Sequence, residues 1–406
     1  MNNTASSKPA TVDETLAVIR KFTSSLGAEQ IHLTKANGRV LCETVCAPED
    51  QPPFDRSAVD GFAIRLDDSS KHFRIIDRIR AGDWKPRKLQ LGEAVQIATG
   101  GALPGAGLQV VMKEDVRVTD DRVEVIERDK DLHIRFRGED AYAGAPLVST
   151  RTRLGPGALA LLASIGGTKP LVSCLPRVMH LATGNEIVPP EQQPDKGQIR
   201  DSNSTLVRAF MEQHGIIPEQ FRVAEDRAAI DSALRTPQCP PHPDLLLISG
   251  GASVGEHDFT RSLLEELGYT IRISRTTTRP GKPLIFATRG DVVAFGLPGN
   301  PLAHFVCLHL YVDAALNCFS GAKVKFEFAE GVLAEEFIPD SNARETLWPA
   351  RVGIDGSNFQ LTPLPWRSSG DLTSLATANA LVRIPPVSGK LAPGAKLQFK
   401  PTAPWL

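Results

Sequence analysis

The chain has 406 residues, of which 41% are hydrophobic and 23% are charged, and its formal net charge is -1. At about 100–200 residues per domain, this length predicts roughly two to four domains. The balanced charge gives no electrostatic reason to expect nucleic acid or an anionic membrane as a partner, so a local site has to hold any anionic ligand. The stretch MNNTASSKPA lacks the features of a signal peptide, and no uninterrupted apolar run of about 18 residues follows. We therefore expect a cytoplasmic protein.

The N-terminal part predicts an amphipathic helix. In TVDETLAVIRKFTSSLG, the residues Leu16, Ile19 and Phe22 fall on one helix face, and the helix is expected to end at Gly27. A second helix is expected in ALALLASIGG, residues 158–167, where a glycine pair again ends the pattern. Between the two helices the chain mixes Pro and Gly with alternating stretches such as RVEVIERD, which predicts an inserted β-rich domain.

From about Pro176 strands and helices alternate. The segments RVMHLATG, QFRVAED, DLLLISGG, PLIFAT and VVAFGLPG are typical of strands, and helices are expected near 204–214, up to Leu234, over 260–267 and from Pro301 to about Cys318. This alternation predicts a mostly parallel sheet covered on both faces. Beyond about Gly331, short strands broken by Pro and Gly predict a C-terminal β domain.

The predicted fold class is therefore a multidomain α/β plus β protein, with a central α/β domain, an inserted β-rich domain and a C-terminal β domain. The expected boundaries are 10–47 together with 146–175 for a discontinuous linking domain, 48–145 for the insert, 176–328 for the α/β domain, and 329–406 for the C-terminal domain.

Three strand ends carry unusual loops: LATGNEIV, LLLISGGASVGEHD and VVAFGLPGNPLAHF. Because ligands bind beyond the carboxyl ends of parallel strands, these loops are expected to face one crevice. Glycine pairs let backbone N–H groups approach an anion, and Asn300 is expected to cap a helix that begins at Pro301. Each loop alone is more often a structural turn, but the three together favour a phosphate- or nucleotide-binding crevice, not of Walker type. The substrate contacts expected there are Gly250, Gly251, Ser253, Gly255, Gly299, Asn300 and Pro301.

Charged side chains accompany these loops. In TTTRPGKPLIF, Arg279 and Lys282 flank a Pro-Gly turn, with Arg275 just upstream; such a turn suits a phosphate or oxyanion, and a solvated basic loop is an equal alternative. Carboxylates at turns or strand ends are a second group: Asp60, Glu186, Asp226 and Asp258. Mg²⁺ needs only one or two carboxylates beside substrate phosphates, but spacing alone favours solvated carboxylates. His257, a lone loop histidine, is not expected to be a ligand.

The stretch QPPFDRSAVDGFAI predicts a rigid extended entry and then a tight turn at the Asp-Gly pair, which would direct Asp60 outward. A purely structural β-turn explains the same residues. Composition does not decide between the two interpretations.

Six segments, in this order, resemble the molybdopterin molybdenumtransferase family, which is related to the C-terminal domain of gephyrin. They are PPFDRSAVDGFAI, TGGALPGAGLQVVMKED, ATGNEIV, SGGASVGEHDF, RPGKP and FGLPGNP, and they span roughly residues 50–305. The α/β segment also resembles the molybdopterin-binding domain of molybdopterin adenylyltransferases and competence-damage proteins. The resemblance implies an elongated homodimer with four domains per chain, a barrel-like C-terminal domain, and an active-site cleft to which both subunits contribute.

The resemblance also implies the chemistry. Such enzymes cleave the pyrophosphate bond of adenylylated molybdopterin with a divalent cation, here Mg²⁺, insert molybdenum from molybdate, and release AMP. A transient contact with the upstream adenylyltransferase is compatible with this role. Carried over by motif, the catalytic positions are Asp60, Thr99, Glu186, Asp226, Asp258 and Lys282, with Glu186 and Asp258 as metal ligands. Arg275 and Arg279, with Lys282, would hold the oxyanion or phosphates.

The sequence departs from the family pattern at three places. Asn185 stands where an aspartate is usual, and Arg275 and Arg279 stand near positions where lysines are common, which leaves the choice between molybdate and tungstate open. In the C-terminal segment the candidates are Arg344, Arg351, Ser369 and Ser374. Two other functions stay open: a scaffold that binds pterin or protein without turnover, and a pyrophosphatase or deamidase of the competence-damage type, which the long match disfavours.

Overall fold

The computed structural model describes residues 8–224, 226, 228, 230, 243–250, 259–322, 328–340, 343–386 and 389–403. Its contacts divide the chain into two compact units. Unit 1 consists of residues 1–42, 151–159 and 169–406, and unit 2 of residues 43–150 and 160–168. The four-domain boundaries expected from the sequence are finer than this division and stay a prediction.

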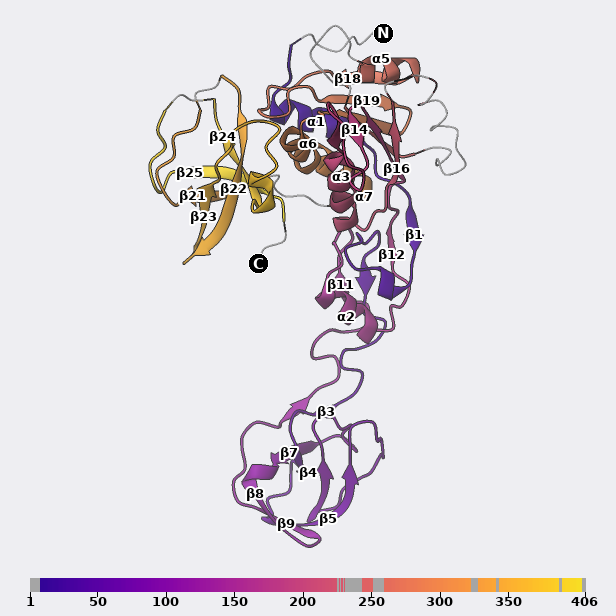
Figure 1. The fold of residues 1–406 in the computed structure, drawn as a ribbon. Coiled ribbons are helices and arrows are strands. Elements are labelled where there is room, and N and C mark those ends of the chain that lie inside the picture. The colour runs from indigo at the N-terminus through magenta and orange to yellow at the C-terminus, as the bar shows by residue number, and fades with distance from the viewer. Residues whose placement is uncertain are drawn as a thin grey trace. The chain divides into compact units, whose positions relative to one another are not determined.

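Unit 2 is built on a six-stranded sheet with the order β7-β4-β6-β5-β9-β8 (Figure 1). Its strands are β4 (Gly61–Arg65), β5 (His72–Ile79), β6 (Glu93–Ile97), β7 (Leu108–Met112), β8 (Val116–Thr119) and β9 (Arg122–Val125). Neighbouring strands are antiparallel except β5 and β6. Apolar side chains are buried on both faces, with Ala63 and Val95 in one cluster and Phe62 and Ile64 in another. The expected β-rich insert is therefore present.

Short strand pairs accompany the two units. In unit 2, β3 (Arg56–Ser57) pairs with β10 (Ile134–Arg135), and β2 (Val45–Cys46) pairs with β11 (Pro146–Val148). In unit 1, β1 (Ala28–Gln30) pairs with β12 (Leu171–Ser173). The second expected helix is α2 (Pro156–Ser164).

Helix α1 (Val12–Phe22) begins at a capping box, in which Thr11 accepts a hydrogen bond from the backbone N–H of Glu14 and the Glu14 side chain accepts one from that of Thr11. Leu16 and Ile19 are buried, as the amphipathic pattern predicts. The helix ends at Phe22, with Thr23 as an extended C-cap, so the expectation of an end at Gly27 was too late.

The α/β part of unit 1 contains a six-stranded sheet with the order β16-β13-β17-β20-β19-β18 (Figure 1). The strands are β13 (Val178–Thr183), β16 (Glu219–Val223), β17 (Leu245–Ser249), β18 (Thr270–Ile273), β19 (Ile285–Arg289) and β20 (Val292–Leu297). β16, β13, β17 and β20 are parallel, and β19 is antiparallel to both of its neighbours. All residues of β13 and β17 are buried, as expected of central strands covered on both faces.

The helices of this part are α3 (Ser202–Gln213), α5 (Phe259–Glu266), α6 (Pro301–Cys307) and α7 (Asp313–Ser320). Helices α1, α3, α6 and α7 contribute to one core cluster, and α5 contributes to a second. The helix expected from Pro301 is interrupted by a π-helical turn, η3 (Leu308–Val312). The run Pro301–Ser320 is long and apolar enough to cross a membrane by composition, but 83% of it is buried inside the protein, which is also usual for a core helix. The helix expected up to Leu234 falls largely outside the described residues.

The C-terminal part of unit 1 is a closed five-stranded barrel with the order β21-β23-β22-β24-β25 (Figure 1). Its strands are β21 (Ala329–Leu333), β22 (Thr346–Asp355), β23 (Asn358–Pro363), β24 (Ala380–Ile384) and β25 (Lys396–Pro401). Trp348, Leu361 and Phe399 lie in its core cluster. The barrel confirms the expected C-terminal β-barrel-like domain.

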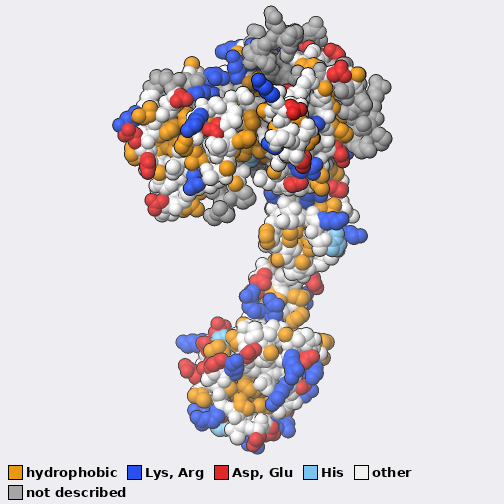
Figure 2. All heavy atoms as spheres, in the orientation of Figure 1, with side chains coloured by type: hydrophobic (Ala, Val, Ile, Leu, Met, Phe, Trp, Pro, Cys, Tyr) orange, Lys and Arg blue, Asp and Glu red, His pale blue; other side chains and the backbone are white. Residues whose placement is uncertain are grey.

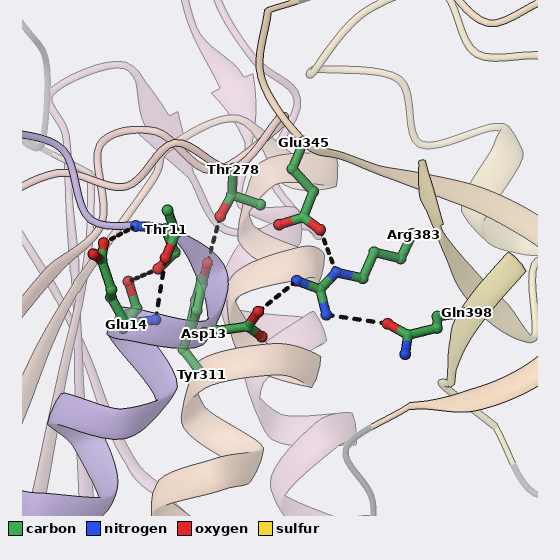
Figure 3. Close-up of polar contacts among 9 residues, drawn as sticks. Thr11, Asp13, Glu14, Thr278, Tyr311, Glu345, Arg383 and Gln398 are labelled. Atoms are coloured by element: carbon green, nitrogen blue, oxygen red, sulfur yellow. Dashed lines mark hydrogen bonds and ion pairs between the residues drawn. The ribbon is translucent and has the colours of Figure 1, made fainter. Parts of the chain in front are cut away.

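Arg383 of β24 connects the barrel to α1. Its Nη2 lies 2.9 Å from Oδ2 of Asp13, its Nη1 lies 3.1 Å from Oε1 of Gln398, and its Nε donates to Glu345 just before β22 (Figure 3). Acidic and basic side chains are interspersed on the visible face of each unit, in keeping with the balanced net charge (Figure 2).

Candidate functional site

The three loops that the sequence singled out follow neighbouring strands. β13, β17 and β20 are adjacent and parallel, so the loops after them leave the same edge of the sheet. A cavity of about 440 Å³ lies at this edge. Its walls include Thr183 and Glu186 from the first loop, Ser249 and Gly250 from the second, and three residues of the third, Gly299, Asn300 and Pro301. The expected crevice therefore exists among the described residues.

Glycine is required where two of these turns meet. Gly250 has φ +95°, and a Cβ there would lie 2.2 Å from the carbonyl oxygen of Thr183. A Cβ on Gly299 would lie 3.9 Å from the Cα of Gly250, so the turns after β17 and β20 pack backbone against backbone. The structure requires glycine at position 250, whereas a Cβ on Gly299 would make only an ordinary van der Waals contact; both turns place backbone on the cavity wall.

Glu186 is an exposed carboxylate that lines the cavity. A Cβ added to Gly184 would lie 2.7 Å from Oε2 of Glu186. The carboxylate therefore packs against the backbone of the Thr183–Gly184 turn. The backbone carbonyl of Glu186 accepts from the N–H of Ile199 at 2.8 Å, but its carboxylate makes no hydrogen bond or ion pair with the described residues, which leaves the carboxylate oxygens available to a ligand or a cation. No group of three or more His, Cys, Asp or Glu side chains suited to a metal occurs in the described part of the chain.

Asn300 occupies the N-cap position of α6, but its side chain does not cap the helix. Nδ2 of Asn300 instead donates to Oγ of Ser369 at 2.9 Å, and the backbone N–H of Leu302 donates to the carbonyl of Ser369 at 3.0 Å. The expectation of a side-chain cap was therefore wrong, because the backbone N–H of Leu302, which a cap could bind, donates to the carbonyl of Ser369 instead. Through this contact a barrel residue adjoins the cavity wall.

The turn containing Arg279 and Lys282 lies beside the cavity, since Pro283 is one of its lining residues. The backbone N–H of Thr276 donates to the carbonyl of Lys282 at 3.0 Å, which closes the turn. Arg275 is exposed and Lys282 is half-buried.

Arg279 is held by the barrel. Its backbone N–H donates to the carbonyl of Glu345 at 2.8 Å, its Nη2 lies 2.9 Å from Oδ2 of Asp340, and its guanidinium lies 4.9 Å from the ring centroid of Trp366. Nη1 of Arg279 is buried and has no hydrogen-bond partner among the described residues. Burial, and next the charge of Arg279, lower the pKa of Arg344. Two guanidinium groups are therefore close enough to repel each other, and an anion would relieve that repulsion.

In unit 2, Asp60 and Thr99 lie together. The backbone N–H and the hydroxyl of Thr99 donate to Oδ1 of Asp60 at 2.8 and 2.9 Å, and Nζ of Lys113 lies 3.5 Å from Oδ2. The hydrogen bonds from Thr99 lower the pKa of Asp60, so the carboxylate stays ionised. Asp60 is exposed, as the predicted turn requires, and Gly61 must be glycine because a Cβ would lie 2.1 Å from the carbonyl oxygen of Val111.

Comparison with known proteins covers the whole length of the chain. Residues 10–166 match the model for the MoeA N-terminal region (domain I and II), residues 180–317 match the probable molybdopterin binding domain, and residues 330–402 match the MoeA C-terminal region (domain IV). A molybdopterin molybdenumtransferase of Bacillus subtilis is 31% identical over 398 residues, which cover 93% of this chain and 90% of that protein. This chain belongs to the molybdopterin molybdenumtransferase family.

Other members of the family support the assignment. A molybdopterin molybdenumtransferase of Staphylococcus epidermidis is 30% identical over 93% of this chain and 92% of its own. Two crystal structures of the molybdopterin biosynthesis MoeA protein of Pyrococcus horikoshii have TM-scores of 0.79 and 0.78, with 29% and 25% identity. They cover 98% and 97% of this chain and 100% of their own. The multidomain fold is thus shared along the chain.

Several positions carried over from the family lie outside the cavity or outside the described residues. Asp226 is exposed beyond β16 and is not a lining residue, although β16 adjoins β13. Arg351 is exposed on β22, and Ser374 is buried in a 3-10 turn, so neither lines the cavity. Gly251, Ser253, Gly255, His257 and Asp258 lie outside the described residues.

Sequence reasoning missed the junction between β15 (Ile199–Arg200) and α3, which lines the cavity with Arg200, Asp201, Ser202 and Asn203. Asp201 caps α3 by accepting a hydrogen bond from the N–H of Ser204 at 2.9 Å. The signal was available, because Asp before a helical pattern is a typical N-cap. It was overlooked because the loops were sought only where strands end.

Proposed function

We propose that this family member inserts molybdenum from molybdate into adenylylated molybdopterin and releases AMP. One observation carries the proposal: in a chain that matches the family along its length, Glu186, Gly250 and Asn300 line one cavity at the carboxyl edge of three parallel strands. This is the edge at which α/β sheets bind ligands. AMP release requires an oxygen to attack one phosphorus atom of the pyrophosphate; that oxygen comes from molybdate or from water.

The guanidinium of Arg279 is the proposed site for the oxyanion, and the charge of Arg344 lies near enough for Arg279 to lower its pKa, after burial. Arg279 Nη1 is a buried donor without a partner among the described residues, and an oxyanion would accept its hydrogen bond. Arg279 is also fixed by Asp340 and Trp366, so its position does not depend on the ligand. Lys282, at the end of the same turn, adds a further positive charge beside the cavity.

Mg²⁺ is a further part of the proposal. Glu186 fits as a ligand because it is an acceptor-only carboxylate on the cavity wall without a partner among the described residues, and Mg²⁺ needs only one or two such groups beside phosphate oxygens. When bound, the cation would offset the charge of the pyrophosphate. Asp258, the second expected ligand, lies outside the described residues.

The proposal also includes a homodimer in the cytoplasm and a transient contact with the enzyme that adenylylates the pterin. The competing function is a scaffold that binds the pterin nucleotide without turnover. Asp60 with Thr99, and Glu186 with Lys282, favour the enzyme, since a scaffold needs neither an ionised carboxylate nor a metal ligand.

The deciding experiment gives the purified protein adenylylated molybdopterin, Mg²⁺ and molybdate. We expect AMP release, together with a product that activates a molybdenum enzyme lacking its cofactor. Binding of the pterin nucleotide without AMP release would establish the scaffold instead.

A further inference from the structure

The first turn of α3 is held rigidly against the sheet. Asp201 is buried and accepts hydrogen bonds from the N–H and the hydroxyl of Ser204 at 2.9 and 2.6 Å. Nε of Arg222, on β16, lies 2.7 Å from Oδ2 of Asp201. Burial opposes the ionisation of Asp201, but these contacts outweigh it and lower the pKa. The residues that follow Asp201 are therefore fixed in position.

Asn203 extends from this turn to the loop after β20. Its Nδ2 donates to the carbonyl oxygen of Gly299 at 2.8 Å. This contact fixes the orientation of the amide, because the reversed orientation would place Oδ1 against the same carbonyl. Oδ1 of Asn203 is buried and has no hydrogen-bond partner among the described residues, and the side chain lines the cavity. An unpaired acceptor is thus held at the cavity wall.

A second side-chain acceptor lines the same cavity, beside hydroxyl groups such as that of Ser202, which can donate or accept. Glu186 presents a carboxylate without a partner among the described residues. Arg200, the cation that lines this cavity, is engaged by the carbonyl of Pro190 at 2.9 Å and by Oε1 of Gln193 at 3.1 Å. A phosphate has no donors to offer these groups at neutral pH, whereas a heterocycle with N–H groups does. The unpaired oxygen of Asn203 therefore suits the ring of a substrate better than a phosphate.

We propose that Oδ1 of Asn203 accepts a hydrogen bond from an N–H group of the pterin ring and so selects the pterin end of the substrate. This inference rests on the proposed function and assigns one residue to one part of the substrate. A pterin carries an amino group and a ring N–H on its pyrimidine edge, either of which complements the unpaired Asn203 oxygen. Asn203 is here a specificity-determining residue rather than a group that takes part in bond cleavage.

The test compares Asn203→Leu with Gln213→Leu, a matched control at an exposed position of the same helix that does not line this cavity. The probes are 6-hydroxymethylpterin, which has no phosphate, and AMP, and their dissociation constants are measured separately by calorimetry. We expect Asn203→Leu to raise the dissociation constant of the pterin about tenfold and to leave that of AMP unchanged. A tenfold change is typical of losing one hydrogen bond and leaving a buried group unpaired. Gln213→Leu is expected to change neither. With the full substrate, Asn203→Leu is expected to raise KM more than it lowers kcat.

The assignment would be overturned if Asn203→Leu bound AMP more weakly and the pterin as well as before, or if its affinity for both probes were unchanged. A wild-type protein that does not bind the pterin would also overturn it. Asn203→Ala is the second variant if the leucine prevents folding. Failure of the proposed function gives a different result: wild-type protein that binds the pterin in an Asn203-dependent way but releases no AMP would contradict turnover while supporting this inference.

Discussion

Nδ2 of Asn300 lies 2.9 Å from Oγ of Ser369, so the residue at the start of α6 makes its side-chain hydrogen bond to the barrel segment rather than to its own helix. Asn300 lines the cavity, and Ser369 belongs to the segment that contains Trp366. Because Trp366 in turn lies against the guanidinium of Arg279, two contacts connect one barrel segment to the candidate site.

The first prediction concerns this pair. Asn300→Ala and Ser369→Ala are each expected to raise KM for the pterin nucleotide several-fold, because either change frees the barrel segment from the cavity wall. Their effects should not add: a double-mutant cycle is expected to give a coupling of about 1 kcal/mol, typical of one hydrogen bond. Additive effects on KM would show that the contact does not position the substrate.

The second prediction concerns Glu186. Glu186→Gln preserves size but removes the charge, and it is expected to raise the Mg²⁺ concentration needed for half-maximal AMP release at least tenfold, without changing the denaturation midpoint. Stability should be unaffected because the carboxylate of Glu186 has no partner among the described residues. Glu191→Gln is the control, since Glu191 is an exposed carboxylate nearby that does not line the cavity. An unchanged Mg²⁺ dependence would exclude Glu186 as a ligand.

The sequence predicted the strands and the three loops because both depend on local patterns. RVMHLATG, DLLLISGG and VVAFGLPG are largely apolar stretches that end at glycine, and they form β13, β17 and β20. The expectation that their loops face one crevice followed from the rule that ligands bind beyond the carboxyl ends of parallel strands. The reversal of β19 was not predicted, because the direction of a buried strand leaves no trace in its apolar pattern.

Long-range side-chain contacts were beyond sequence reasoning. Asn300 looked like a helix cap until Ser369, sixty-nine positions later, was found to accept its hydrogen bond. Arg279 was expected at a phosphate or oxyanion, with a solvated loop cation as the alternative, and its contacts with Asp340 and Trp366 of the barrel were not predicted. Asp60 and Thr99 were singled out separately by motif, and only the fold shows that they are hydrogen-bonded.

The third prediction concerns Thr99. Thr99→Val removes the hydroxyl that donates to Asp60 and should raise the pKa of that carboxyl toward its ordinary value, because one of the bonds favouring the ionised form is lost. If the ionised form is needed, the acidic limb of the pH profile of AMP release shifts to higher pH. Thr119→Val, at an exposed position of β8, serves as the control. A profile that keeps its acidic limb would show that Asp60 is not required in its ionised form.

The fourth prediction concerns Arg383, which bridges Glu345 and Asp13 (Figure 3). Arg383→Met is expected to destabilise unit 1 by about 2 kcal/mol, because it leaves Glu345 half-buried without its guanidinium partner. Asp13→Asn should cost less than about 1 kcal/mol, since Asp13 is largely exposed. Denaturant unfolding monitored by tryptophan fluorescence measures the free energy of unfolding of both variants. Equal losses of stability in the two variants would contradict the expectation that the Glu345 contact contributes more than the Asp13 contact.

The fifth prediction concerns three buried histidines. Burial is the largest cause that lowers the pKa of His180 to about 3, of His304 to about 4 and of His309 to about 3. Nε2 of His180 lies 2.6 Å from Oγ of Ser249, and its Nδ1 lies 3.0 Å from Nε2 of Gln220, so the neutral ring is hydrogen-bonded on both sides. As the pH falls below about 6.5 the unfolded chain gains protons that the folded chain does not accept, and stability falls.

Between about pH 6 and pH 4.5, each of these histidines is expected to add roughly 1.4 kcal/mol per pH unit to the loss of unfolding free energy. His180→Gln should lower the free energy of unfolding at pH 7 by about 1–3 kcal/mol, because hydrogen bonds of the ring are lost. It should also reduce the slope of the unfolding free energy against pH, because one histidine no longer takes up a proton on unfolding. His72→Gln, at an exposed position, should change neither. Urea titrations at several pH values measure both quantities, and a His180→Gln variant with the wild-type slope would mean that His180 is protonated in the folded protein.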